Sequence, residues 1–265
     1  GEQLGTISLL RREKMLSPDG ELLLVPVISG NSLRGALRRI GEDLLRAELA
    51  YDGQLSLSAA HALRGGGALA KCQGPALTGI RLSTVRELIP LVGVFGTAAG
   101  GTIVDGCLQV GKALPVVSEL AALLPPWPGG SPRPSLYDLV QVENYARQDD
   151  VDRHGFLDRC TAAPELGPVD SRQMQFGVET LAAGTRLVSW MQLSWATPME
   201  ISFFTEVLQV FAARGRVGGR IAAGHGQVAV SLHRQVLAGQ DQPVQWRAML
   251  AARHADAIEA LTWLT

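Results

Sequence analysis

Cysteine is scarce in this sequence, and its three copies lie far apart. Cys72, Cys107 and Cys160 are odd in number and form no Cys-x-x-Cys pair, which argues against a disulfide framework and against a zinc knuckle. No apolar run approaches the roughly 20 residues that a bilayer-spanning helix needs, and no signal-peptide pattern is seen. We therefore expect a protein of the reducing cytoplasm that does not contact a membrane.

Net charge is lacking as well. The 24 lysines and arginines nearly cancel the 25 acidic residues, so no global field favours a polyanion or a basic substrate. Lysine is rare, with only Lys14, Lys71 and Lys112, which leaves 21 arginines. Genomic base composition is the simpler explanation of this skew. The alternative is a set of sites that need the planar guanidinium group to hold a phosphate at two points.

The chain does contain enough apolar sequence for a sizeable core. Its 265 residues suit one large or two small domains, and 46% hydrophobic against 18% charged residues excludes wholesale disorder. Residues 111–183 are the least regular part, because five prolines between Pro125 and Pro134 and an acidic run at 149–152 disfavour helix and strand.

A helix is predicted after Ser29–Ser32, whose polar side chains can cap its start. Four apolar residues then recur at the spacing of one buried helix face: Leu33, Leu37, Ile40 and Leu44. Arg34, Arg38 and Arg39 fall outside this stripe, so we expect their side chains in solvent.

Another helix is predicted from Thr197 to Gly215. Thr197 and Glu200 form a capping box around a proline at the first helical position, and Gly215 is a suitable C-terminal stop. Further helices are expected around the pair Thr84 and Glu87, read as a second capping box, and over Trp246–Trp263.

Short strands are expected at Leu4–Leu10, Thr102–Val110, Gly184–Trp195 and Gln227–Leu232. With the two main helices they give the order strand, helix, strand, strand, helix, strand, which is the ferredoxin-like βαββαβ pattern. The predicted fold class is α+β. Residues 1–111 and 184–265 would form the ferredoxin-like domain, with a helical insertion at about 51–101 and an irregular insertion at 112–183.

Two segments combine glycine with arginine. The first is Ser29-Gly30-Asn31-Ser32-Leu33-Arg34-Gly35, where a helix start offers free N–H donors and a partial positive charge to a phosphate. Arg34 and Arg38 lie one turn apart beside it. An ordinary capped helix with solvated arginines explains the same residues.

The second segment, 214–226, has five glycines and three arginines and no acidic residue. Glycines allow close backbone approach and free N–H groups to face an anion. A flexible connector between helix and strand is the alternative.

Several other motifs fail on context. Residues 106–113 resemble a phosphate-binding P-loop, but Ala113 replaces the hydroxyl that binds magnesium. Gly224, Gly226 and Ala229 imitate a dinucleotide-binding fingerprint, yet they precede a strand instead of following one. Residues 30–35 are one residue too long for a nucleophile elbow.

Neither a metal site nor a catalytic centre is indicated. A cluster of three aspartates and one histidine could ligate a metal, but no matching ligand group appears elsewhere: Asp149, Asp150, Asp152 and His154. His225 could act as a general acid or base in RNA cleavage, although such a histidine more often binds backbone or phosphate. We expect no metal, no cofactor and no catalytic residue.

The sequence resembles a known family at four places, in the family's order. Asp19-Gly20 and residues 25–35 resemble the "D-G-x-P-x-I-P-G-S-S-L-K-G" stretch of the RAMP superfamily, the RNA-binding proteins of CRISPR systems. Val92–Thr97 resembles its "L-F-G", residues 175–188 resemble its "V-x-A-G-T-x-F", and residues 218–226 resemble its C-terminal glycine-rich loop. The pattern is most similar to the backbone subunits that polymerise along guide RNA, in the form found in type IV effector complexes.

The resemblance implies an RRM-like palm, with the insertion near residues 112–183 as a protruding thumb. It implies four kinds of partner: guide RNA (crRNA), a complementary target nucleic acid, further copies of the chain in a helical filament, and other CRISPR effector subunits. Carried over by position, the RNA contacts would come from the helix start, the thumb base and the glycine-rich loop. They are Ser29, Gly30, Asn31, Ser32, Arg34, Arg38, Arg172, Met174, Phe176, Arg216, Gly218, Gly219, Arg220 and His225.

One departure from the family pattern bears on activity. Relatives that cleave their target carry an aspartate in the loop after the first strand, whereas residues 11–18 of this chain contain none. Glu13 is the one acidic residue there. The resemblance therefore implies a subunit that binds guide RNA without cleaving the target. A guide-processing endoribonuclease that uses His225 and a protein–protein module without RNA are the alternatives.

Overall fold

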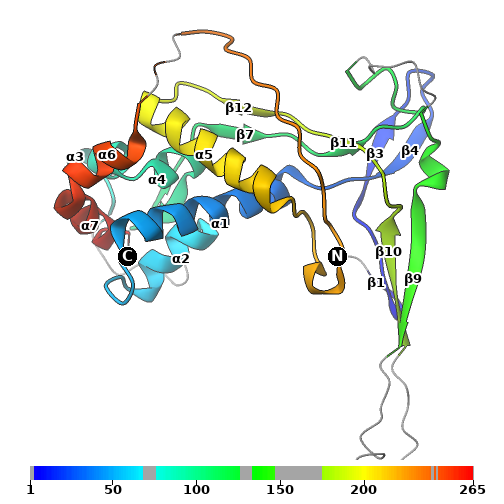
Figure 1. The fold of residues 1–265 in the computed structure, drawn as a ribbon, viewed down its shortest axis with the longest axis horizontal. Coiled ribbons are helices and arrows are strands. Elements are labelled where there is room, and N and C mark those ends of the chain that lie inside the picture. Colours follow the sequence, from blue (N-terminus) through cyan, green and yellow to red (C-terminus); the bar gives the residue numbers. More distant parts are fainter. Residues whose placement is uncertain are drawn as a thin grey trace, which may run out of the picture. The chain divides into compact units, whose positions relative to one another are not determined.

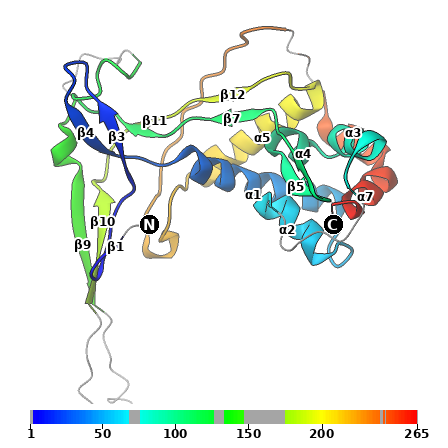
Figure 2. The same ribbon diagram turned by 180° about the vertical axis from the view of Figure 1, so that it is seen from behind.

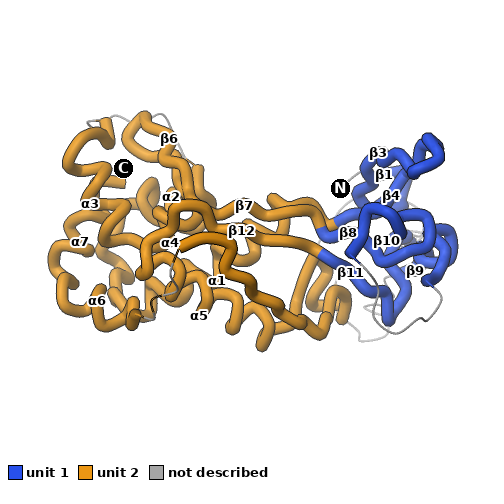
Figure 3. The backbone as a smooth tube through the Cα atoms, turned by 90° about the horizontal axis from the view of Figure 1, so that it is seen from above, with its two compact units in different colours: residues 1–27, 113–188 blue, residues 28–112, 189–265 orange. Residues whose placement is uncertain are grey.

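The computed structural model of the protein describes residues 3–67, 76–125, 133–146, 175–239, 242 and 244–264. The chain divides into two compact units (Figure 3): residues 1–27 with 113–188 form unit 1, and residues 28–112 with 189–265 form unit 2. Helices and small sheets both contribute, as expected for an α+β protein. The first 27 residues group with the long insertion, whereas we had expected them in the ferredoxin-like domain.

Unit 1 is built from strands. Its largest sheet has the order β1-β2-β10-β9, from β1 (Gln3–Leu4), β2 (Ile7–Ser8), β10 (Gln175–Leu181) and β9 (Val140–Ala146). β10 pairs antiparallel with β9 along its whole length and parallel with β2. The expected strand Leu4–Leu10 is thus two short strands, separated by a turn at Gly5, whose φ is +59°.

Two further strand pairs complete unit 1. β3 (Arg12–Leu16) and β4 (Leu22–Pro26) form a hairpin, and β8 (Leu114–Pro115) pairs with β11 (Leu187–Val188). The hairpin turn falls at Ser17–Gly20, where Gly20 has φ +82°. Unit 1 has a small apolar core of its own, to which the short 3-10 helix Leu136–Asp138 contributes Leu136. Its buried residues are Leu23, Val25, Val27, Val116, Val117, Leu120, Leu124, Leu136 and Leu139.

Unit 2 is mostly helical (Figures 1 and 2). α1 (Gly30–Leu49) packs against α2 (Leu57–Gly65), α4 (Pro90–Phe95) and α5 (Pro198–Arg214). All six residues of α4 are buried, so this short helix passes through the core. The capping box of Thr197 and Glu200 starts α5 as predicted, and Gly215 ends it in a left-handed conformation.

Two predicted helices are broken. The helix expected around Thr84 begins at Gly79, with Thr78 as N-cap, and α3 (Gly79–Leu88) ends before Pro90, which cannot donate a hydrogen bond within a helix. The expected capping box of Thr84 and Glu87 is wrong, because both residues lie inside α3. The C-terminal helix divides at Arg253 into α6 (Trp246–Ala252) and α7 (His254–Thr262).

Short strand pairs accompany the helices of unit 2. β5 (Thr97–Ala99) pairs with β6 (Thr102–Val104), and β7 (Leu108–Val110) pairs antiparallel with β12 (Met191–Leu193). The prediction of a strand at Gln227–Leu232 is wrong, because the described residues there form no strand. Only a single bridge between Arg216 and Gln227 occurs there.

Candidate nucleic-acid interface

The start of α1 is a capped helix end, as the sequence predicts. The Ser29 side chain accepts a hydrogen bond from the Ser32 amide at 3.2 Å. Asn31 and Ser32 are exposed. Gly30 lies so close to β7 that a Cβ atom there would collide with the main-chain oxygen of Val110, and glycine therefore lets the helix start rest on this strand.

Arg34 does not extend into solvent, contrary to expectation. Its guanidinium group donates to the main-chain oxygens of Leu108 at 2.6 Å and Phe95 at 2.7 Å. Burial is the main cause of a lowered pKa for Arg34. The side chain thus ties α1 to the end of α4 and to β7.

Arg38 is buried, with 6% of its surface exposed, and the expectation of a solvated side chain is wrong. Both terminal nitrogens donate to the main-chain oxygen of Gly96, one of them at 2.9 Å, and the guanidinium carbon lies 5.7 Å from the centre of the Phe95 ring. Burial, and secondarily the neighbouring Arg34, lower the pKa of Arg38 to about 10. The Arg38 side chain therefore stabilises the fold and is not available at the surface to bind a ligand.

The reason for this burial lies outside the sequence of α1. The turn after α2 crosses Arg38: a Cβ atom on Gly66 would be 2.7 Å from the Arg38 guanidinium carbon. The amide of Ala98 in turn donates to Gly66 at 3.0 Å. A second face of α1 is therefore covered, beside the stripe of leucines.

Arg39 is the one cation in the first half of α1 that remains at the surface. It is exposed, and in the part of the chain that the structure describes it has no ion-pair partner. One of its terminal nitrogens lies 3.7 Å from the Cβ position of Gly35, so the side chain turns back along the helix toward its N-terminal end. Sequence reasoning placed Arg39 off the buried stripe but assigned the RNA contact to Arg38. Nothing in the residues of α1 alone could have distinguished them.

The glycine-rich segment after α5 is a closed loop. The amide of Val217 donates to Gly226 at 2.9 Å, and the amide of Val228 donates to Gly215 at 2.7 Å. Gly226, with φ +71°, lies so close to the Val217 oxygen that a side chain would not fit. A short 3-10 helix, η3 (Ile221–Ala223), forms the far end, where Arg220 adopts φ +55°.

The outer part of this loop is open to solvent. Residues 218–224 are all exposed, and so is Arg216, which has no ion-pair partner among the described residues. Neither Gly218 nor Gly219 has an atom within 4 Å of its Cβ position. No acidic residue occurs between Glu206 and Asp241. His225 is half-buried, and its amide lies 3.4 Å from the Arg220 oxygen.

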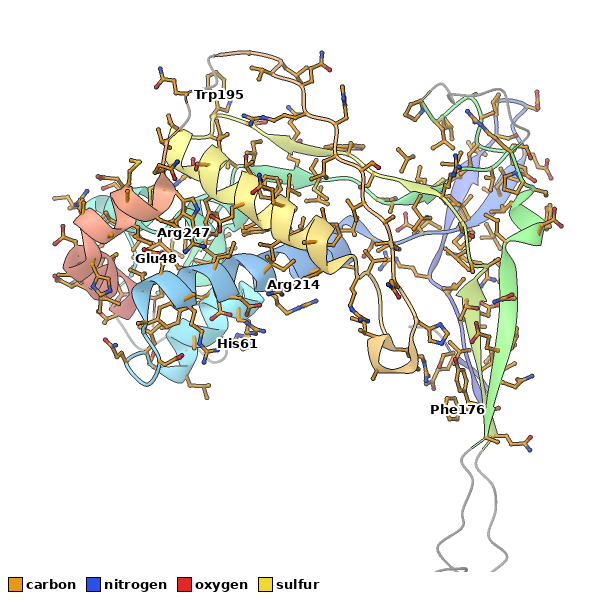
Figure 4. The ribbon with its side chains drawn as sticks, in the orientation of Figure 1. Glu48, His61, Phe176, Trp195, Arg214 and Arg247 are labelled. Carbon is orange, nitrogen blue, oxygen red and sulfur yellow. The ribbon has the colours of Figure 1, made fainter. Side chains whose placement is uncertain are left out.

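Both segments belong to unit 2. In Figures 1 and 2 the start of α1 and the end of α5 lie toward the same end of this unit. At the base of the loop, Arg214 (labelled in Figure 4) pairs with Asp43 at 3.1 Å, and Arg64 pairs with the same carboxylate at 3.0 Å. Partial burial raises the pKa of Asp43, but these hydrogen bonds outweigh it and lower the pKa overall. Arg214 is thus held by protein, in contrast to Arg216.

The residues expected at the thumb base are placed only in part. Arg172, Met174 and the acidic run at 149–152 with His154 lie outside the described residues. Phe176, on β10, stacks on Tyr145 of β9 with ring centres 5.4 Å apart (Figure 4). A flat aromatic pair therefore lies at the end of the β9–β10 pair where Ala146 and Gln175 are opposite each other.

The one acidic residue between positions 11 and 18 lies in a strand. Glu13 belongs to β3, opposite Val25, and pairs with Arg11 at 3.3 Å. The next residue toward the N-terminus, Arg12, is bound by both carboxylate oxygens of Glu179, at 2.7 and 3.0 Å. Within the described ranges, no group of three or more potential metal ligands occurs.

In the described part of the chain, no helix is long and apolar enough to cross a membrane. No protein-family model and no curated protein matches the chain. Among solved structures, a chain of a "Type IV-B CRISPR Complex" is 33% identical. The alignment covers 89% of this chain and 87% of that one, with a TM-score of 0.52. A crystal structure of Csc2 from Thermofilum pendens aligns over 83% of this chain and 56% of its own, with 17% identity and a TM-score of 0.36.

Identity of one residue in three over nearly the full length of both chains shows common descent. The aligned length takes in most of both units, so the relationship is not confined to one motif. It agrees with the resemblance in the sequence, whose motifs run from Asp19 to Gly226. The chain therefore belongs to the same family as this subunit of a type IV-B CRISPR complex.

Proposed function

We propose that this subunit binds the sugar-phosphate backbone of a guide RNA, without reading its sequence and without cleaving it. The glycine-rich loop carries the proposal: residues 218–224 are exposed, the loop has no acidic residue, and its path is fixed by main-chain hydrogen bonds. Such a surface offers amide donors and guanidinium groups to phosphates. Several copies would follow the RNA in a ferredoxin-like, RRM-like palm-and-thumb arrangement and present its bases to a complementary target.

The proposed contact surface differs from the expected one on α1. Asn31, Ser32 and Arg39 share the exposed side of the helix start, so we assign the phosphate contacts to them. Ser29 and Gly30 support this surface as the cap and as the contact with β7. Arg34 and Arg38 support it from inside, through main-chain oxygens.

The loop supplies the second part of the surface. Arg216 and Arg220 provide charge, Gly218 and Gly219 leave the main chain accessible, and His225 lies at the base. The β9–β10 pair, with Phe176 near the end where Ala146 and Gln175 lie opposite each other, is the proposed thumb. Because stacking and phosphate contacts tolerate any base, this binding should be uniform across guide sequences.

A salt titration of guide-RNA binding tests the proposal. Fluorescence anisotropy of a labelled guide is measured for the wild-type chain and for Arg39→Ala, Arg216→Ala and Arg46→Ala. Arg46 is the matched control, because it is an exposed arginine of the same helix that pairs with Asp52 near its far end. Loss of affinity with the first two variants and not with the third supports the proposal. Equal behaviour of all three contradicts it.

Incubation with RNA tests the absence of cleavage. Neither a precursor guide nor a complementary target should be cut by the purified subunit. Site-specific products that disappear in His225→Ala would establish the endoribonuclease alternative. A protein that purifies without RNA, in oligomers that nuclease leaves intact, would establish the protein–protein module.

A further inference from the structure

The outer face of the β7–β12 pair carries a tryptophan that no predicted site includes. Gln109 and Gln192 are directly opposite each other in the antiparallel register, and both are exposed. The hydrogen bond from the Gly111 amide to Trp190, at 2.8 Å, continues the ladder by one pair. Because side chains alternate along a strand, Trp190, Gly111 and the two glutamines share one face. Leu108, Val110, Met191 and Leu193 point the other way, into the core.

The indole of Trp190 lies flat across the neighbouring strand. A Cβ atom on Gly111 would be 2.5 Å from the indole nitrogen and 2.7 Å from two ring carbons. Near-equal distances to three ring atoms place this point over the ring face. Glycine at 111 therefore makes room for the ring, whose other side is open, since 57% of Trp190 is exposed. The result is an aromatic platform on a sheet surface.

The two chain segments that carry the platform bring no negative charge to it. Residues 106–112 and 189–195 contain no acidic residue, and Lys112, directly after Gly111, is exposed. Each glutamine amide offers a donor and an acceptor, which is the pairing that a base edge presents. A protein-docking surface would instead surround its aromatic anchor with further apolar residues.

The platform also lies beside the helix start of the proposed interface. Gly30, at the beginning of α1, has the main-chain oxygen of Gly111 at 3.4 Å from its Cβ position and that of Val110 closer still. A strand that leaves a phosphate near Asn31 and Ser32 would thus have a base within reach of the same stretch of β7.

We propose that Trp190, lying on Gly111 and flanked by Gln109 and Gln192, stacks with an unpaired nucleobase of single-stranded nucleic acid. This inference rests on the proposed function for its ligand class and adds a base site to the phosphate contacts. Stacking on an aromatic side chain is tolerant of sequence, so the site accepts any base.

Binding of an oligodeoxythymidine of about 15 nucleotides, compared with an abasic oligomer of equal length, tests the platform. Trp190→Ala should weaken binding of the base-containing strand by about five- to a hundredfold and leave the abasic strand unaffected. Trp190→Phe should be intermediate. Trp195→Ala removes the other exposed tryptophan that flanks β12 and should change neither. Equal effects of Trp190→Ala on both strands, or no effect, would overturn the proposal.

A second variant separates stacking from loss of folding. Gly111→Ala keeps the indole but displaces it from the strand, so it should weaken base-dependent binding while the circular dichroism spectrum stays unchanged. If Trp190→Ala unfolds the chain, the comparison of Trp190→Phe and Gly111→Ala with wild type decides the matter. Wild-type binding by both would contradict the platform.

Photo-cross-linking distinguishes the possible sources of the base. A guide substituted with 4-thiouridine should cross-link to the peptide that contains Trp190 if the guide supplies the base. A substituted second strand added to guide-loaded protein should do so if the target supplies it, and either result supports the proposal. Association of copies that depends on Trp190 without any cross-link would overturn it in favour of a protein partner. Retention of the guide, measured with Arg39→Ala and Arg216→Ala, reports separately on the proposed function.

Discussion

Two segments of this subunit combine glycine and arginine, and the fold uses them in opposite ways. On α1 the guanidinium groups of Arg34 and Arg38 turn inward and donate to main-chain oxygens at the end of α4 and in β7. In the loop after α5, Arg216 stays in solvent. The difference comes from what covers each segment: the turn at Gly66 lies across α1, and nothing lies within 4 Å of the Cβ positions of Gly218 and Gly219. Composition alone does not separate an arginine that holds the fold from one that is free to bind a ligand.

The sharpest form of this comparison is between two adjacent arginines. Arg38→Ala should lower the free energy of unfolding by about 2–4 kcal/mol, because it leaves the Gly96 oxygen without its donor and creates a cavity beside Phe95. Arg39→Ala should change it by less than about 0.5 kcal/mol, since its side chain is at the surface. Urea unfolding of both variants measures the difference. Equal stability of the two would show that Arg38 does not support the fold.

The loop can be tested through two of its glycines. Gly226→Ala should destabilise the closed loop by about 1–3 kcal/mol, since the new Cβ meets the Val217 oxygen and φ is positive. Gly219→Ala faces open space at an ordinary φ and should leave stability unchanged. Thermal unfolding and protease sensitivity near the loop report the effect. If Gly219→Ala weakens RNA binding without loss of stability, the RNA backbone approaches that residue closely.

Removing a surface arginine should change the salt dependence of the RNA-binding constant. Arg39→Ala and Arg216→Ala are each expected to weaken binding by about three- to tenfold and to reduce the slope of log K against log salt by roughly 0.7–1. The reduction should be the same for guides of different sequence. A loss confined to particular sequences would mean that these residues read bases.

The smallest expected effect concerns the pH dependence of unit 1. Hydrogen bonds from Arg12 and from the Leu10 amide lower the pKa of Glu179, although partial burial opposes them. A carboxylate with a depressed folded-state pKa stabilises the protein above its unfolded pKa, near 4.5, and this contribution is lost as the pH falls through the folded value. Glu179→Gln should therefore reduce the loss of stability on acidification below about pH 4.5. Unfolding midpoints measured from pH 7 to pH 3 check this.

The sequence was sufficient where local chemistry decides the structure. Three predicted helix ends depend on residues within a few positions of one another: the Ser29 cap, the capping box at Thr197 and the stop at Gly215. The class of the fold and the family also followed from local patterns. These local signals predict where helices begin and end, but they do not predict which elements pack against each other.

The sequence was insufficient where distant segments meet. Arg38 is buried by a turn 28 residues further along, and the indole of Trp190 lies on a glycine 79 residues before it. Pro90, which has no amide hydrogen to donate, divides the helix expected around Thr84 and Glu87, and the entirely buried α4 begins there. The strand expected at Gln227–Leu232 has the right alternation, but alternation does not supply a pairing partner.

The closure of the glycine-rich loop by main-chain atoms has a practical consequence. Main-chain atoms of Val217, Gly226, Gly215 and Val228 fix its path, and the exposed methyl group of Ala222 at its tip is not among the groups that do so. A cysteine introduced at that position could carry a fluorophore or spin label without altering the scaffold. The loop would then report directly, by a change in signal, when a ligand arrives and when it leaves.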